Sequence, residues 1–127
     1  MKVLVVDDDP KIAAYLQKLL EKMECEPVIA STGKEAMQVF ENEPADVVLL
    51  DLFLPDARGD QLIPGFRKRW PDVQVITMTG YNSDELERTV RSIGVVYYMI
   101  KPFEVENLKL LIGHMKTRYR KGGNNAG

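Results

Sequence analysis

Cysteine is almost absent from this 127-residue chain, and the single one, Cys25, excludes an internal disulfide. Such usage fits a reducing compartment, in which Cys25 would serve as a small apolar core residue. The chain also lacks a large excess of charge of one sign, because its net charge is only -2. Such a charge gives no indication of binding to nucleic acid or to a membrane surface. No apolar run is long enough to span a bilayer, and no signal-peptide pattern opens the chain. We therefore expect a cytoplasmic protein that by itself binds neither nucleic acid nor membrane.

Acidic residues, by contrast, stand at informative places. Three aspartates, residues 7–9, follow the apolar run Val3–Val6, and Asp51 follows the run Val47–Leu50. Continuous apolar runs of this length are typical of parallel strands buried on both faces. Carboxylates gathered at strand ends repel one another by roughly 4 kcal/mol per pair at about 4 Å and an effective dielectric of about 20. Such a cluster needs a cation, and Mg²⁺ prefers oxygen ligands of this kind. The pattern indicates phosphoryl chemistry.

The rest of the chain alternates between strand patterns and helix patterns. The predicted strands are residues 2–7, 26–30, 46–51, 73–79 and 95–100. The predicted helices are residues 10–23, 34–43 and 84–93, a weakened helix that ends near residue 70, and a last helix whose inner stripe runs from Val105 to Tyr119. Five such units predict an α/β fold with an open parallel sheet and helices on both faces.

Local signals add detail to this arrangement. Asp9 and Pro10 form a typical helix start, and Gly94 a typical helix end. Pro27 cannot donate to a strand ladder, so its strand belongs at an edge of the sheet. By analogy with flavodoxin-like doubly wound (βα)5 folds, we expect the strand order 2-1-3-4-5. We expect residues 1–121 to form one domain and residues 122–127 to be a flexible tail, a linker or an end added for expression.

This strand order predicts where a ligand would bind. In open parallel sheets, ligands bind beyond the carboxyl ends of the strands at a topological switch point, which here lies between the first and third strands. That crevice would bring together Asp7, Asp8 and Asp51, with Thr79 and Lys101 at the neighbouring strand ends. Five polar groups on one rim indicate a functional site.

Five motifs, each at a strand end or in the loop that follows, carry a resemblance to a known family. They are Val5-Val6-Asp7-Asp8-Asp9, Asp51-Leu52-Phe53-Leu54-Pro55-Asp56, Gly59, Thr79-Gly80 and Lys101-Pro102-Phe103. In this order the motifs resemble those of the response-regulator receiver domain of two-component signal transduction systems. The resemblance extends from residue 2 to about residue 120. Each motif is weak alone, and their order is what makes the signal specific.

The resemblance implies a phosphorelay role for the acidic cluster. Asp51 would be the phosphoacceptor that attacks the phosphohistidine of a sensor histidine kinase or phosphotransfer protein, forming an aspartyl phosphate. Asp8 would bind Mg²⁺ directly and Asp7 mainly through water, with Asp51 and the backbone carbonyl of Phe53 completing the protein ligands. Mn²⁺ would be a substitute metal. Asp9 would be a helix cap and not a ligand. The chain would be a stoichiometric phosphoacceptor that catalyses its own phosphorylation and dephosphorylation, not an enzyme.

The resemblance also implies a phosphoryl pocket and a switch. Lys101 would hold one phosphoryl oxygen, and the Thr79 hydroxyl with the Gly80 amide another. The peptide before Pro102 would be cis. Thr79 and Tyr98 would move on phosphorylation and reshape the face built by residues 84–93, 95–100 and the last helix. That face would bind an effector domain or a downstream protein, or a second copy of the chain. For Tyr98, a half-buried edge-strand tyrosine is the alternative.

Some positions depart from the common family pattern. In receiver domains, the two positions that Phe53 and Tyr81 occupy here modulate how readily water reaches the aspartyl phosphate, and both side chains are bulky. We therefore predict slow autodephosphorylation. Asp60 stands where an apolar residue is usual, and Pro64-Gly65 interrupts a helix, so we expect an irregular helix start there.

Other classes fit the residues less well. A haloacid-dehalogenase-type phosphatase needs a second aspartate where this chain has Phe53. A flavodoxin-like cofactor binder would have a Gly/Ser/Thr-rich phosphate loop after the first strand, where this chain has aspartates. A receiver fold used as a phosphorylation-independent interaction module stays an alternative, although no member of its acidic set is missing. Both a stand-alone receiver and the N-terminal receiver of a longer regulator fit the sequence.

Overall fold

Five parallel strands form one sheet in a computed structural model that describes residues 1–126, with side chains described up to Tyr119. The strands are β1 (Lys2–Val6), β2 (Glu26–Ala30), β3 (Val47–Asp51), β4 (Gln74–Thr79) and β5 (Tyr97–Ile100). Their order is β2-β1-β3-β4-β5, and all four pairings are parallel. This confirms the predicted fold class and strand order, with Pro27 on an edge strand.

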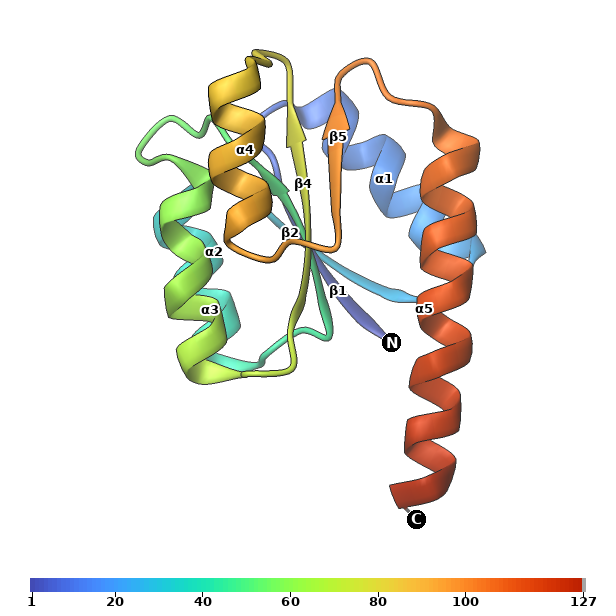
Figure 1. Cartoon of the computed structure of the whole chain (residues 1–127). Coiled ribbons are helices and arrows are strands. Elements are labelled where there is room, and N and C mark those ends of the chain that lie inside the picture. Colours follow the sequence, from blue (N-terminus) through green and yellow to red (C-terminus); the bar gives the residue numbers. More distant parts are fainter. Residues whose placement is uncertain (127) are drawn as a thin grey trace.

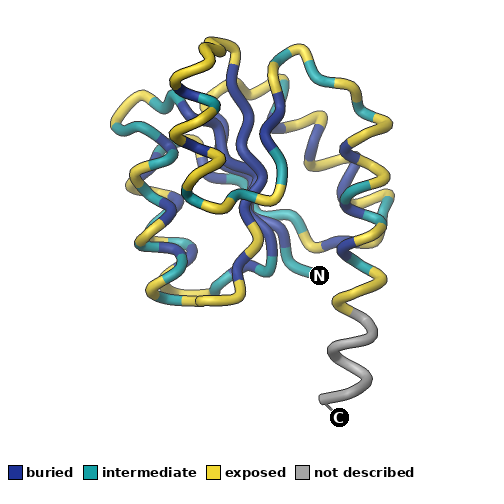
Figure 2. The backbone as a smooth tube through the Cα atoms, viewed as in Figure 1, coloured by how far each residue is buried: buried dark blue, intermediate teal, exposed yellow. Residues whose placement is uncertain are grey.

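Helices cover both faces of the sheet (Figure 1). They are α1 (Pro10–Lys22), α2 (Gly33–Asn42), α3 (Ile63–Arg69), α4 (Asp84–Ser92) and α5 (Val105–Ala126), with a short 3₁₀ turn, η1 (Gly59–Leu62), before α3. In Figure 1, α1 and α5 lie on one side of the sheet, and α2, α3 and α4 on the other. Successive side chains of a strand point to opposite faces, so β1 contributes Val3 and Val5 to one core and Leu4 and Val6 to the other. The three central strands, β1, β3 and β4, are buried along almost their whole length, whereas the edge strand β2 is mostly half-buried (Figure 2).

Several predicted helix boundaries have the expected physical cause. The Asp9 side chain accepts a hydrogen bond from the Lys11 amide, and Pro10 occupies the first turn of α1. Gly94 follows α4 with a φ of 87°, a conformation that glycine adopts without steric cost. The predicted irregularity near Asp60 is the 3₁₀ turn η1, which leaves only seven residues for α3.

Two expectations about α5 need correction. Tyr119, predicted to lie on the inner stripe, is 49% exposed, because the helix there has passed Met115, the last of its described residues that is buried. The backbone of residues 122–126 continues the helix, whereas the composition predicts no folded element. Extending an existing helix does not require the unfavourable nucleation step that a new helix needs, and this favours a helical continuation. Gly127 lies outside the described residues, and the division into a domain of residues 1–121 and a tail stays a prediction.

Gly59 lies in close contact with the backbone at the end of β3. Its amide donates to the carbonyl of Leu52 over 2.8 Å, and a Cβ added to Gly59 would overlap the Asp51 carbonyl oxygen. We expect Gly59→Ala to lower the free energy of unfolding by about 3 kcal/mol, because the overlapping atoms are backbone and must shift together. Denaturation in urea measures this change.

Gly113 provides a matched control for that substitution. It lies inside α5, and an added Cβ would have no neighbour within 4 Å. Gly113→Ala should therefore stabilise the protein by about 0.5 to 1 kcal/mol, as alanine does in a helix interior. Equal stability changes for the two glycines would contradict the close approach at Gly59.

Candidate phosphoacceptor site

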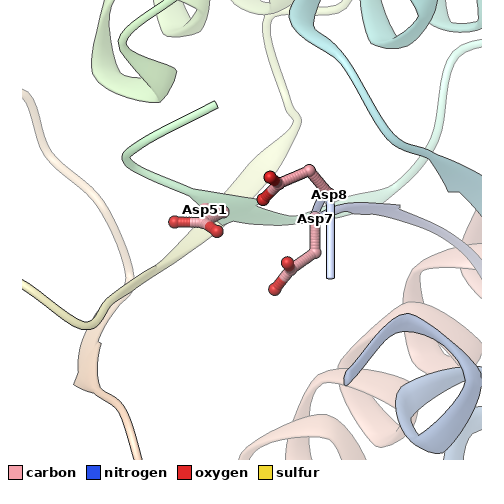
Figure 3. Close-up of side chains that lie close together, drawn as sticks. All are labelled: Asp7, Asp8 and Asp51. Atoms are coloured by element: carbon pink, nitrogen blue, oxygen red, sulfur yellow. The ribbon is translucent and has the colours of Figure 1, made fainter. Parts of the chain in front are cut away.

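The carboxyl ends of β1 and β3 bring three aspartates together. Asp7 and Asp8 follow β1, and Asp51 is the last residue of β3. One carboxylate oxygen from each lies within 4.8 Å of the other two, and Figure 3 shows the three side chains grouped at these strand ends. The three predicted acidic residues therefore lie together at the carboxyl ends of the first and third strands, as expected.

Lys101 supplies the positive charge of this cluster. Its Nζ donates to Asp7 Oδ2 over 2.9 Å and to Asp51 Oδ2 over 3.0 Å. Asp7 is 1% exposed and Asp51 5% exposed, so both ion pairs are shielded from solvent. A buried carboxylate without a partner is costly, and one lysine here serves two of them. Three carboxylates against one ammonium leave an excess negative charge at the site.

Burial and pairing shift the titration of these groups. Burial raises the pKa of Asp51, although hydrogen bonds from the Phe53 amide and the Lys101 ammonium act in the opposite direction. For Lys101, burial alone would lower the pKa, but the hydrogen bonds and charges of Asp7 and Asp51 outweigh it and raise the pKa. The ammonium is thus held in its charged form beside a weakly solvated carboxylate. A weakly solvated carboxylate is a better nucleophile than one surrounded by water.

The acceptor atoms of the cluster suit a divalent cation. Asp7 Oδ1 accepts from the Asp9 amide over 2.9 Å and Asp51 Oδ1 from the Phe53 amide over 3.1 Å, which orients both carboxylates. Asp8 is exposed and, among the described residues, its carboxylate accepts no hydrogen bond. Hard cations such as Mg²⁺ bind one or two carboxylates and keep several waters, so this donor set fits them.

The residues predicted to contact a phosphoryl group lie on the neighbouring strands. Thr79 ends β4 and is fully buried, and its Oγ1 accepts a hydrogen bond from the Tyr81 amide over 3.0 Å. Gly80 follows it and is exposed, and a Cβ added there would meet no atom within 4 Å. Lys101 follows β5, and the Lys101–Pro102 peptide is cis, as predicted. The structure therefore places Thr79, Gly80 and Lys101 at the same edge of the sheet as Asp51.

Tyr98 differs from the alternative of a half-buried edge tyrosine. It is only 5% exposed, and its hydroxyl donates to Asn82 Oδ1 over 2.8 Å. It packs in a small cluster with Leu86 and Val90 of α4. Asn82 carries no sequence signal for this role, because its partner lies 16 residues away. Tyr98 thus ties β5 to the loop between β4 and α4.

Two aromatic residues, Phe53 and Tyr81, follow the carboxyl ends of β3 and β4. The rings of Phe53 and Tyr81 meet edge to face with centroids 5.4 Å apart. The Arg58 guanidinium lies over the Phe53 ring, 5.1 Å from its centroid. Phe53 is also held through its backbone, because its amide donates to Asp51. The two positions predicted to modulate access of water are therefore in contact with each other.

Asp56 has a role that its place in the motif does not reveal. Its two carboxylate oxygens accept hydrogen bonds from the Gly33 and Lys34 amides, over 2.8 and 2.9 Å. These are donors of the first turn of α2, which a helix itself leaves without partners. Asp56 therefore fastens the loop after β3 to α2. No short-range pattern predicts this, because the partners are more than twenty residues apart.

The hydrogen bonds from the Gly33 and Lys34 amides lower the pKa of Asp56. A carboxylate whose pKa is lower in the folded state stabilises the protein above its unfolded-state pKa and loses that effect as the pH falls through the folded-state value. We expect Asp56→Ala to lower the denaturation midpoint at neutral pH, and the difference from the parent chain to shrink below about pH 4. Asp72→Ala removes an exposed aspartate outside these contacts and should change the midpoint little at either pH. A difference that persisted unchanged in acid would contradict the ionic role of Asp56.

Known proteins share this fold and these motifs. The family model for the response regulator receiver domain matches residues 3–113. A probable C4-dicarboxylate response regulator, DctR, of Halalkalibacterium halodurans is 30% identical over 123 residues, which are 95% of this chain and 54% of that protein. The chain spans about half the length of DctR and of the transcriptional regulatory protein CitT of Bacillus subtilis, two curated proteins that it matches.

Solved structures agree with these matches. A CheY-like receiver domain protein from Methanospirillum hungatei is 31% identical with a TM-score of 0.86, covering 95% of this chain and 97% of that one. A response regulator protein from Burkholderia pseudomallei, solved with a phosphorylated aspartic acid and a calcium ion, is 28% identical with a TM-score of 0.78 over 84% of this chain and 63% of that one. Among the described residues, no helix combines the length and hydropathy that a membrane span requires. The motifs, the fold and these matches together show that the chain belongs to the response regulator receiver domain family of two-component systems.

Proposed function

We propose that Asp51 accepts a phosphoryl group from the phosphohistidine of a sensor histidine kinase or a phosphotransfer protein. The observation that carries the proposal is the buried Asp51 carboxylate, oriented by the Phe53 amide and paired with Lys101. Receiver domains serve phosphorelay signalling and are not turnover enzymes. Cys25 is buried and is a free cysteine, and a free cysteine fits a reducing compartment. We therefore place the proposed reaction in the cytoplasm.

In the proposed reaction, an Asp51 carboxylate oxygen attacks the phosphorus of the phosphohistidine. The phosphorus–nitrogen bond breaks, its electron pair stays on the imidazole nitrogen, and a phosphorus–oxygen bond to Asp51 forms. Lys101 would move from the Asp51 carboxylate to a phosphoryl oxygen, and the Thr79 hydroxyl with the Gly80 amide would bind another. Because charge spreads over the phosphoryl oxygens, fixed donors of this kind lower the barrier.

A divalent cation would complete the site. Asp8 would ligate Mg²⁺ directly, since its carboxylate accepts no hydrogen bond among the described residues, and Asp7 would act mainly through water. Asp51 and the backbone carbonyl of Phe53 would supply the remaining protein ligands, and Mn²⁺ would be a substitute. When bound, the ion supplies positive charge to the phosphoryl oxygens and offsets repulsion among the carboxylates.

Phosphorylation would change the face formed by α4, β5 and α5, and a partner would bind to that face. Tyr98 links β5 to the loop that follows Thr79, so a movement of Thr79 would reach this face. Ile100 and Leu110 are 45% and 73% exposed there and offer apolar contact area to a partner. The partner would be an effector domain, a downstream protein or a second copy of the chain. We place any effector domain in the part of a longer regulator that this chain does not span.

Incubation with acetyl phosphate, with and without Mg²⁺, tests the proposed chemistry through the intact mass of the protein. We expect one phosphoryl addition that depends on Mg²⁺ and maps to Asp51. Continuous consumption of the donor without a stable adduct would instead indicate a phosphatase. Folded protein that neither gains a phosphoryl group nor binds beryllofluoride would favour a phosphorylation-independent interaction module.

A further inference from the structure

The loop after β3 carries a cation that the proposed chemistry does not use. Arg58 lies opposite Phe53 in an isolated antiparallel bridge, and the Leu54 amide donates to the Ala57 carbonyl within the same loop. The Arg58 guanidinium stands 5.1 Å from the centroid of the Phe53 ring, within the range of a cation–π contact. Arg58 therefore contacts Phe53, which lies two residues after Asp51, the proposed phosphoacceptor.

Asp60 holds this arginine in place. Arg58 Nε donates to Asp60 Oδ1 over 3.0 Å, and the Asp60 side chain is 12% exposed. A guanidinium fixed by a carboxylate loses little further freedom when it rests on a ring, so the contact with Phe53 is preorganised. The pair also explains an aspartate at a position where receiver domains usually have an apolar residue.

The contacts continue from the ring to the phosphoryl pocket. Phe53 meets Tyr81 edge to face, and the Tyr81 amide donates to the Thr79 hydroxyl oxygen. Tyr81 is 74% exposed, so it has few contacts beyond this pair to keep it in place. Phe53 packs against the buried cluster of Leu52, Leu86, Val90 and Tyr98, and the Arg58 guanidinium lies over its ring, so the position of the aromatic pair depends on these contacts of Phe53.

We propose that Arg58 is a positioning residue that keeps the Phe53–Tyr81 pair over the aspartyl phosphate and so slows its hydrolysis. The inference rests on the proposed function of Asp51. In hydrolysis, a water oxygen attacks the phosphorus, the bond from phosphorus to the Asp51 oxygen breaks, and its electron pair returns to the carboxylate. The water loses a proton to solvent, and inorganic phosphate leaves. A ring pair held across the approach of that water lowers the rate without contacting the reacting atoms.

Decay of the phosphorylated protein, followed by intact mass after removal of acetyl phosphate, tests this role. We expect Arg58→Ala to lose its phosphoryl group about threefold faster than the parent chain, the size expected for a lost exposed cation–π contact. Phe53→Ala should be faster still, and Arg58→Ala should add nothing in the Phe53→Ala background, because it acts through that ring. Arg118→Ala, which removes an exposed arginine on α5, should match the parent chain.

Two results would overturn the inference. Equal half-lives for the parent chain and Arg58→Ala would show that the arginine does not matter. An unchanged acceleration in the Phe53→Ala background would show that Arg58 acts on the phosphoryl charge directly and not through the ring.

A second readout keeps the inference separate from the proposed function. Nuclear Overhauser contacts between the Phe53 and Tyr81 rings can be measured in the unphosphorylated protein. We expect them to be strong in the parent chain and weakened in both Arg58→Ala and Asp60→Ala. If the parent chain takes no phosphoryl group, the proposed function fails, and these contacts still decide whether Arg58 positions the rings. Contacts unchanged by Arg58→Ala would reject that role.

Discussion

Asp51→Asn should abolish the gain of a phosphoryl group from acetyl phosphate, even with saturating Mg²⁺. Asparagine has the shape of aspartate, so the side-chain oxygen can still accept from the Phe53 amide, and the buried strand end keeps its packing. The amide lacks the anionic oxygen that must form the new bond to phosphorus. Intact mass should therefore show the unmodified protein only, whereas the parent chain gains one phosphoryl group.

Asp9→Asn is the matched control for that loss. Asp9 lies two residues from Asp7, but its side chain caps α1, and asparagine caps a helix about as well as aspartate. The Asp9→Asn chain should be phosphorylated like the parent chain. Phosphorylation that survives Asp51→Asn would move the acceptor to another residue, and peptide mapping would then identify it.

Lys101→Met should produce the second large effect, on both stability and phosphorylation. Its ammonium contacts two buried carboxylates, and removing one partner of a buried ion pair leaves the other without compensation. We expect the free energy of unfolding to fall by about 3 kcal/mol without Mg²⁺. We also expect phosphorylation to slow by about a hundredfold, the loss typical of a missing donor to developing negative charge. Urea denaturation and the time course of intact mass measure the two effects.

Addition of Mg²⁺ and a second lysine variant sharpen this test. Mg²⁺ should restore part of the stability lost in Lys101→Met, because it neutralises the same carboxylates. Lys18→Met changes an exposed lysine of α1 and should alter stability by less than about 0.5 kcal/mol. If Lys101→Met were as stable as Lys18→Met, the two buried ion pairs would contribute nothing measurable to the fold.

The architecture was predictable because its signals are short-range. Apolar runs mark the strands, and Val3–Val6 and Val47–Leu50 are buried along their full length. Asp9-Pro10 and Gly94 mark helix ends through backbone and side-chain geometry that acts within a few residues. Parallel strands align their carboxyl ends, so residues that follow different strands meet even when they are distant in sequence. This is why Asp7, Asp8, Asp51 and Lys101 could be placed at one edge.

Tertiary structure decided how these residues and their neighbours pair. The double contact of Lys101, the link from Asp56 to α2 and the bond between Tyr98 and Asn82 join residues 16 to 94 positions apart. The contacts of Phe53 with Arg58 and Tyr81 depend on the conformations of two loops. The hydrophobic periodicity of the sequence does not predict these conformations.

The sequence by itself therefore determined which segments become strands and helices and which carboxylates reach the common edge, because burial and capping act locally. Only the folded chain decided which side chain contacts which, since such contacts depend on loop paths and on the packing of helices against the sheet.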